Sequence, residues 1–359
     1  MGRVAVIDIG TVTCRLGVAD VTAGRVQRCA KTSTICNLGE GVAETGRLSE
    51  AACGRVLACV DQALAQARAA GAPVGCCTLT SAARDAENSA VLLDGLRARG
   101  VVPQVIPGEV EGSLTFLGVA QDFRGQRIMV ADNGGGSTEI AVGTLAVEGA
   151  GDAFAGAPGV GAGAASAGGP DAASAGPTGL DLEAVRSLNV GCRRVTDLFL
   201  SREDPPSADS LAKARAFCCD AFEEGLPAAA RGASEPGRLV CVGGTVTTLV
   251  AISARLNPYD PSFVHLHELP LAEVDTLAER LASLPLARRR EVVGLQPKRA
   301  GVIVAGAVCV GELMRACGVD RLTVSESDLL FGLSLVADAT AKGKPSPIGW
   351  HPELFALRW

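Results

Sequence analysis

The chain has 359 residues, enough for two domains of ordinary size, and its 48% apolar but only 3% aromatic composition predicts aliphatic cores. The formal net charge of −6 disfavours a general nucleic-acid binder, which is usually basic, although a cleft in an acidic protein can be locally basic. No stretch resembles a membrane span and the first residues do not resemble a signal peptide. We therefore expect a cytoplasmic protein with no membrane or nucleic-acid partner.

Thirteen cysteines raise the question of disulfides or zinc. They form no Cys-x-x-Cys pair, their number is odd, and most stand in apolar stretches. These features favour buried, reduced thiols, as in cytosolic proteins, over a disulfide framework or a zinc site.

The first half of the chain begins with an apolar run at 3–9 that contains an acid, Asp8. A turn of small residues, Gly10 to Thr13, leads into a second apolar run at 14–19, so the pattern predicts a β-hairpin. An acid in a buried strand is costly unless it is paired or binds a metal. Asp8 is therefore a candidate functional residue.

A predicted helix at 50–70 and a buried strand at 74–80 lead into a short helix that carries Arg84 in its first turn. The helix dipole favours anions there, so Arg84 is better explained by binding a phosphate than by stability. An exposed surface arginine is the alternative. A helix at 89–99 and a strand at 101–106 follow, and then a helix at 112–121 crosses into the second half. Glu109 and Glu111 stand at its start, where carboxylates are favoured in any case.

The second half opens with a strand at 127–131 that runs into Asp132, three glycines, Ser137, Thr138 and Glu139, and then into another strand at 140–143. Glycine amides can form an anion-binding nest, and carboxylates on either side suit Mg²⁺. This pattern repeats the one around Asp8, which predicts two similar domains facing one cleft. A plain glycine turn and two unrelated hairpins are the alternatives.

The remaining sequence contains a Gly/Ala-rich segment at 148–179, which is interpreted as a disordered hairpin insertion because it cannot bury enough surface to order itself. A strand from Arg238 ends in Gly243-Gly244-Thr245 at a helix start, a second candidate site for an anion or a nucleoside. Further helices are expected at 207–225, 271–283, 286–292, 301–317 and 328–341, a last strand at 321–324, and an irregular tail at 343–359. The predicted domains are 1–124 and 125–335, and helix 328–341 is a candidate to pack back on the first.

Several of these motifs occur together in an order that resembles the exopolyphosphatase/guanosine pentaphosphate phosphohydrolase (Ppx/GppA) family, in its short two-domain form. They are Asp8-Ile9-Gly10 with Arg15-Leu16, Thr80 to Asn88, Gly108 with Glu111, Asp132 to Glu139, Gly243-Gly244-Thr245 and Gly294 to Ala300. The resemblance implies an α/β fold of two ribonuclease-H-like domains, of the actin, sugar kinase and heat-shock-70 type, around a central cleft. It also implies release of terminal phosphate from inorganic polyphosphate or pppGpp with Mg²⁺ or another divalent cation. The implied partners are polyphosphate or guanosine penta- or tetraphosphate, and a homodimer is possible.

The resemblance also assigns roles to residues. It places the catalytic base at Glu111 and the metal-side acids at Asp8, Asp132 and Glu139. The candidate phosphate-binding and substrate-binding residues are Thr11, Thr13, Arg15, Arg84, Gly134, Gly135, Gly136, Ser137, Thr138, Gly243, Gly244 and Thr245.

The chain departs from the family pattern at several positions. Val12 removes a polar side chain from the first loop, Asn133 replaces the usual isoleucine, and Gly112 replaces alanine. The stretch Ser325 to Leu330 lacks the usual glycine and arginine. Val12 and Asn133 keep open a weakly active or non-catalytic protein that binds pppGpp or polyphosphate. The Gly243-Gly244-Thr245 turn, which would suit an adenosine, keeps open an ATP-dependent phosphotransferase of the same fold.

Overall fold

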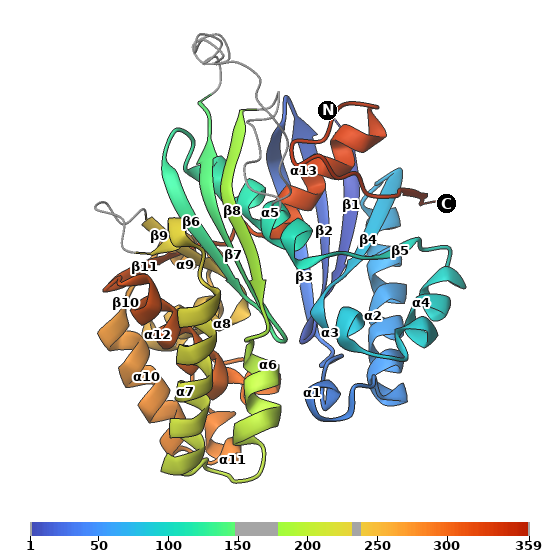
Figure 1. Ribbon diagram of the computed structural model, residues 1–359. Coiled ribbons are helices and arrows are strands. Elements are labelled where there is room, and N and C mark those ends of the chain that lie inside the picture. Colours follow the sequence, from blue (N-terminus) through green and yellow to red (C-terminus); the bar gives the residue numbers. More distant parts are fainter. Residues whose placement is uncertain (1, 148–178, 232–237, 358–359) are drawn as a thin grey trace, which may run out of the picture.

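The computed structural model describes residues 2–147, 179–231 and 238–357, and over these ranges the chain forms two six-stranded sheets with helices packed on them (Figure 1). Almost all of the predicted insertion at 148–179 lies outside the described residues. No helix in the described ranges combines the length and apolar composition needed to cross a membrane.

The first sheet begins with three antiparallel strands, of which the first also pairs in parallel with β4. β5 continues the parallel side, and β12 pairs antiparallel with the start of β4. Its strands are β1 (Gly2–Ile9), β2 (Thr13–Thr22), β3 (Arg25–Ile35), β4 (Val74–Leu79), β5 (Pro103–Val105) and β12 (Phe355–Ala356). The helices of this half are α1 (Val42–Thr45), α2 (Glu50–Ala69), α3 (Ser81–Asp85) and α4 (Ser89–Arg97).

The second sheet repeats the same plan, with an antiparallel meander continued by parallel strands, in the order β10-β11-β9-β6-β7-β8. Its strands are β6 (Arg127–Asn133), β7 (Thr138–Leu145), β8 (Leu180–Leu188), β9 (Arg238–Val242), β10 (Glu268–Pro270) and β11 (Arg321–Val324). The accompanying helices are α6 (Cys192–Val195), α7 (Ala208–Gly225), α8 (Gly244–Ser253), α9 (Pro261–Val264), α10 (Leu271–Ser283), α11 (Leu286–Arg289) and α12 (Ile303–Cys317). A π-helical turn, Thr196–Leu200, extends α6.

Two helices, α5 (Gly108–Val119) and α13 (Leu329–Ala341), lie between the sheets (Figure 1). α5 packs on β7 and β8 of the second sheet, whereas α13 packs on β1 and β2 of the first. The two helices meet at glycines: a Cβ on Gly118 would overlap the carbonyl of Asp328, and one on Gly332 would overlap that of Leu114. This close crossing joins the two halves of the molecule.

The structure contains three strands that the sequence-based expectations lack: β3, β12 and the three-residue β10. β3 was not predicted, because its side chains are mostly exposed and polar and give no apolar alternation. The tail was expected to be irregular, but Phe355 and Ala356 add β12 to the first sheet, with Phe355 buried. All thirteen cysteines are unpaired, and all but Cys29 and Cys219 are buried.

Candidate phosphate-binding and catalytic site

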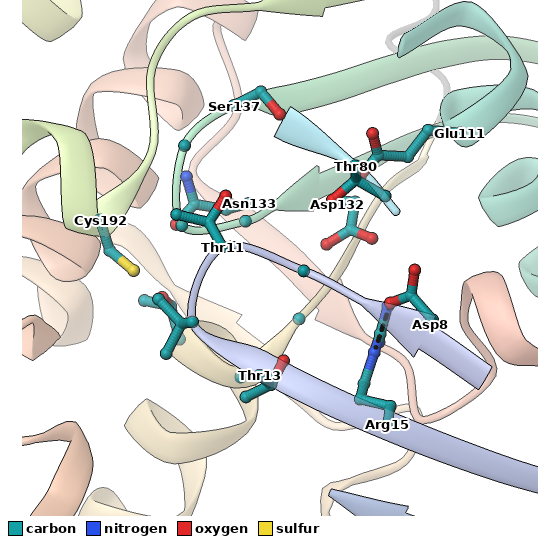
Figure 2. A pocket seen from close by; sticks show the side chains of 18 of the residues that line it. Asp8, Thr11, Thr13, Arg15, Thr80, Glu111, Asp132, Asn133, Ser137 and Cys192 are labelled. Carbon is teal, nitrogen blue, oxygen red and sulfur yellow. Dashed lines mark hydrogen bonds and ion pairs between the residues drawn. The ribbon is translucent and has the colours of Figure 1, made fainter. Parts of the chain in front are cut away.

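A cavity lies between the two halves, lined by the loop of each hairpin, by the start of α5 and by the start of α8 (Figure 2). In Figure 2 the side chains of Asp8, Glu111 and Asp132 lie on one side of this space, and the loop residues Thr11 and Ser137 lie on the other. The lining residues are Asp8, Gly10, Thr11, Val12, Thr13, Arg15, Thr80, Glu111, Asp132, Asn133, Gly134, Gly135, Gly136, Ser137, Cys192, Gly243, Gly244, Thr245 and Arg299.

The acid of the first hairpin is paired inside the hairpin. Asp8 on β1 stands opposite Arg15 on β2, and its Oδ2 accepts hydrogen bonds from Arg15 Nη2 at 2.7 Å and Nε at 3.0 Å. Thr78 Oγ1 lies 3.2 Å from the other oxygen. Arg15 also donates to Asp328, the N-cap of α13, at 3.1 Å. The charge of Asp8 is therefore largely balanced without a ligand.

The second hairpin places two acids opposite each other. Asp132 on β6 faces Glu139 on β7 across the ladder. Burial raises the pKa of Asp132 to about 6; Arg15 opposes the rise, and the charges of Asp328 and Asp8 add to it. Burial and the charge of Asp132 raise the pKa of Glu139 to about 7. Burial and the neighbouring charges therefore disfavour the charged forms of both carboxyl groups in the absence of a cation.

The two loops share one backbone plan. Gly10 N donates to Thr13 O at 2.8 Å, and Gly134 N donates to Ser137 O at 3.0 Å, so each loop is closed by the same short turn. The amides of Gly135, Gly136 and Ser137 donate no hydrogen bond within the described part of the chain. They are the backbone donors left for an anion, whereas the Gly134 amide, also predicted to cradle phosphate, is used inside the loop.

Glu111 lies in the first turn of α5 and is buried at the edge of the cavity. Its Oε2 accepts a hydrogen bond from Arg84 Nη1 at 2.7 Å, and the same nitrogen donates to Ile106 O at 2.9 Å. Burial and the charge of Glu139 raise the pKa of Glu111 well above its usual range, and Arg84 opposes this rise. A raised carboxyl pKa and a fixed side chain are what a general base near neutral pH requires.

Three of the predicted site residues do not line the cavity. Arg84 contacts Glu111 instead, and Arg84 Nη2 lies 3.8 Å from Glu139. Glu139 is buried, and its Oε1 accepts a hydrogen bond from Ser187 at 2.7 Å. Thr138 is fully buried and donates to Val190 O at 2.6 Å. The other predicted residues all line the cavity.

Arg299 is a lining residue that was not assigned a site role from the sequence. It is 8% exposed, and its guanidinium makes no hydrogen bond or ion pair with any described residue. It lies against the backbone of Gly244, where a Cβ would overlap it. A buried, unpaired guanidinium is costly in an empty site and favourable beside an anion. Arg299 stands inside the motif Gly294 to Ala300, so the sequence did point to this segment, but only the contacts in the structure show that the guanidinium is buried without a partner.

The other lining residues missing from the predicted set are Gly10, Thr80, Cys192, and the two departures from the family pattern, Val12 and Asn133. Val12 packs with Cys192 and Val302 of the second half, so it makes an apolar contact across the cavity. Asn133 Nδ2 donates to Thr138 Oγ1 at 3.0 Å and braces the base of the second loop. Each of the two side chains thus makes a contact of its own, an apolar one for Val12 and a hydrogen bond for Asn133.

The glycines near α8 are required by backbone geometry. Gly243 has a φ of 99°, and a Cβ there would lie 3.0 Å from both Asn133 O and Asp132 Oδ1. The start of α8 therefore approaches the second loop closely. It brings Gly244 and Thr245 to the cavity edge, near Arg299.

Two matching hairpins across a cavity, with a helix pair between two sheets of the same topology, define an α/β protein of the actin-like type. The sequence model of the Ppx/GppA phosphatase family matches residues 17–159 and 166–334 of the chain. The chain belongs to this family.

Curated and structural relatives agree with this assignment. Exopolyphosphatase 2 of Mycobacterium tuberculosis is 31% identical over 350 residues, which is 93% of this chain and 98% of that protein. A crystal structure of an exopolyphosphatase-like protein is 28% identical with a TM-score of 0.77, covering 93% of this chain and 97% of that one. The Aquifex aeolicus Ppx/GppA family member is 25% identical with a TM-score of 0.69, covering 95% and 98%.

Proposed function

We propose that this protein removes the terminal phosphate from inorganic polyphosphate, from pppGpp or from both, with the help of Mg²⁺. Membership of the Ppx/GppA phosphatase family and the similarity to an exopolyphosphatase support this reaction class. The observation that carries it is the set of unused anion donors at the cavity: the amides of Gly135, Gly136 and Ser137 and the unpaired guanidinium of Arg299.

The chemistry follows from positions and charges. The free amides of the second loop, the hydroxyls of Thr11 and Thr13 and the guanidinium of Arg299 would hold the terminal phosphoryl group. Glu111 would accept a proton from the attacking water, and Arg84 would keep its carboxylate aimed at the cavity. Phosphoryl transfer depends mainly on such positioning and on charge stabilisation, so no covalent intermediate is required.

The residues present fit a magnesium ion that is completed by the substrate. Among the described residues, no three His, Cys, Asp or Glu side chains gather closely enough to hold a metal. Mg²⁺ is commonly bound by one or two carboxylates together with substrate phosphates and water. Asp132, buried with a raised pKa, is the first candidate ligand, and Asp8 is the second. When bound, the ion would offset charge on the phosphoryl oxygens.

The role that we propose for Glu139 differs from the role of metal-side acid that the family resemblance assigns to it. It does not line the cavity, and Ser187 occupies one of its oxygens. We therefore assign it to the electrostatics of the site, where it raises the pKa of Glu111 and adds to the attraction for a cation.

The test is phosphate release by the purified protein from polyphosphate and from pppGpp in parallel, with Mg²⁺ and with a chelator. We expect Mg²⁺-dependent release from at least one substrate. Absence of release from both would contradict the proposal. Formation of ADP from ATP and an acceptor would then favour the phosphotransferase alternative, and binding without turnover would favour the non-catalytic one.

A further inference from the structure

The turn Gly191–Asp197, here called the clasp, holds the second loop from behind. Its backbone amides donate to the loop carbonyls: Cys192 N to Gly134 O at 3.0 Å, and Arg193 N and Arg194 N to Gly135 O at 2.8 and 3.0 Å. The contact is close, because a Cβ on Gly191 would lie 2.5 Å from the carbonyl of Gly135. The shape of the loop therefore depends on the clasp.

Holding a carbonyl also directs the next amide. In a planar trans peptide the C=O and the following N–H point in opposite directions. A carbonyl of the loop that is held by the clasp thus turns the N–H of the next residue away from the clasp. Gly134 O sets the amide of Gly135, Gly135 O sets that of Gly136, and Gly136 O sets that of Ser137.

The carbonyl of Gly136 is held differently from its counterpart in the first loop. There, Val12 O accepts two backbone hydrogen bonds, from Cys36 N and Asn37 N, both at 2.9 Å. In the second loop, Gly136 O accepts from a side chain, Arg194 Nε, at 2.8 Å. The orientation of the Ser137 amide therefore depends on one side chain that substitution can remove.

The same arginine reaches across to the first half of the molecule. Arg194 Nη2 pairs with Asp85 Oδ2 at the end of α3, the helix that also carries Arg84. Two further contacts of the clasp cross between the halves: Arg193 Nη2 to Asn37 Oδ1 at 3.2 Å, and Gly41 N to Asp197 Oδ2 at 3.0 Å. The guanidinium is a rigid planar fork, so the pairing with Asp85 fixes where Nε lies.

We propose that Arg194 is a positioning residue that aims the Ser137 amide at the substrate phosphate, and that it does so only when its pairing with Asp85 holds the two halves together. This proposal rests on the proposed function for its catalytic consequence, but the loop geometry can be tested without turnover. Lysine cannot replace Arg194, because a single ammonium cannot serve Gly136 and Asp85 in the same fixed geometry.

The kinetic test compares Arg194→Lys with Arg127→Lys. Arg127 is a matched control: it pairs through two hydrogen bonds with Glu183, both at 2.7 Å, and also donates to the carbonyl of Ala229, but it does not line the cavity. A hydrogen bond to a charged group is worth about tenfold or more in an equilibrium. We expect Arg194→Lys to lower kcat/KM by about tenfold or more, mainly through KM, and the control to leave it unchanged.

The coupling is tested with Asp85→Asn. Because both residues act through one contact, the double variant should lose no more kcat/KM than Arg194→Lys alone. Additive losses would overturn the coupling, and a loss in Arg194→Lys no larger than in Arg127→Lys would overturn the positioning role.

Amide hydrogen exchange separates this proposal from the proposed function. Without substrate, exchange of the Cys192, Arg193 and Arg194 amides should be faster in Arg194→Lys than in Arg127→Lys, because the loop they hold is no longer fixed. Equal exchange rates in the two variants would show that Arg194 does not fix the second loop, even if the enzyme is active. If the wild type hydrolyses neither substrate, the proposed function fails. The exchange experiment still decides whether Arg194 fixes the geometry of the second loop.

Discussion

The two hairpins have the same backbone plan but differ in the residue that faces the acid on the neighbouring strand. In the first, Asp8 faces Arg15 and forms an ion pair at 2.7 Å. In the second, Asp132 faces Glu139, and both carboxyl pKa values are raised, to about 6 and about 7. One topology therefore supplies one hairpin whose acid is paired internally and another whose two carboxyl groups have raised pKa values, and we propose that a cation binds at the second. In the proposed reaction, the first candidate magnesium ligand and the free backbone amides therefore lie on the second hairpin, whereas the first contributes Asp8 and the hydroxyls of Thr11 and Thr13.

The largest effect is expected at the carboxylate beside the second hairpin. Glu111→Gln should lower kcat by about 10²–10⁴-fold, because a positioned general base contributes that much, and should leave the fold intact. The measurement is steady-state phosphate release together with a circular dichroism spectrum. Glu109→Gln is the matched control, since Glu109 lies in the same turn but is exposed. Equal rates in the two variants would remove Glu111 from the mechanism.

The next prediction tests the asymmetry directly. Asp132→Asn should raise the Mg²⁺ concentration for half-maximal activity by about 10–100-fold or more, since even the loss of a partner outside the metal's own ligands has that effect. Asp8→Asn should raise it less, because Asp8 already has Arg15 as a partner. A magnesium titration of both variants decides the matter. Equal shifts would mean that the two hairpins share the ion evenly.

The third prediction concerns stability and pH without divalent ions. The pKa of Glu139 is about 7 in the folded protein, against an ordinary value of about 4.3. Between these two pKa values the Glu139 carboxyl binds a proton more tightly in the folded state than in the unfolded chain. Its contribution to the free energy of unfolding therefore falls as the pH rises from the lower value to the higher one.

Glu139→Gln should reduce that fall, which thermal melting in a chelator between about pH 5 and about pH 8 would show. Glu183→Gln, at an exposed glutamate paired with Arg127, serves as the control. A Glu139→Gln variant whose melting temperature depends on pH as steeply as the control's would contradict the assignment.

The smallest effect is expected at the loop residue that contacts both halves. Val12→Ala removes two methyl groups from the cluster with Cys192 and Val302, which should cost about 1–2 kcal/mol of stability by the usual value per buried methylene. KM should rise only modestly, because the Val12 carbonyl is still held by two amides. Unchanged melting together with a large rise in KM would show that the side chain acts on substrate instead.

The sequence predicted the parts of this site that local pattern encodes. Asp8, Asp132 and the glycines stand at strand ends, where the change from apolar to small residues is visible, and Glu111 stands at a helix start. The family resemblance and the actin-like fold it implied are confirmed. The residue roles stay predictions.

What the sequence did not predict depends on contacts between distant segments. Arg84 was expected to bind phosphate, but its nearest carboxylate, Glu111, is 27 positions away along the chain. Arg194 and Asp85 are separated by 109 positions, and no local sequence pattern indicates that they pair. The burial of Arg299 and the lack of a partner for its guanidinium among the described residues depend on the fold, and no single position in a sequence reveals them.

The crossing of α5 and α13 sets how closely the two halves of the molecule approach each other. Gly118 and Gly332 bring the two helix backbones into direct contact, with no room for a Cβ at either position. A side chain at either glycine would therefore push apart the two helices and the sheets on which they pack.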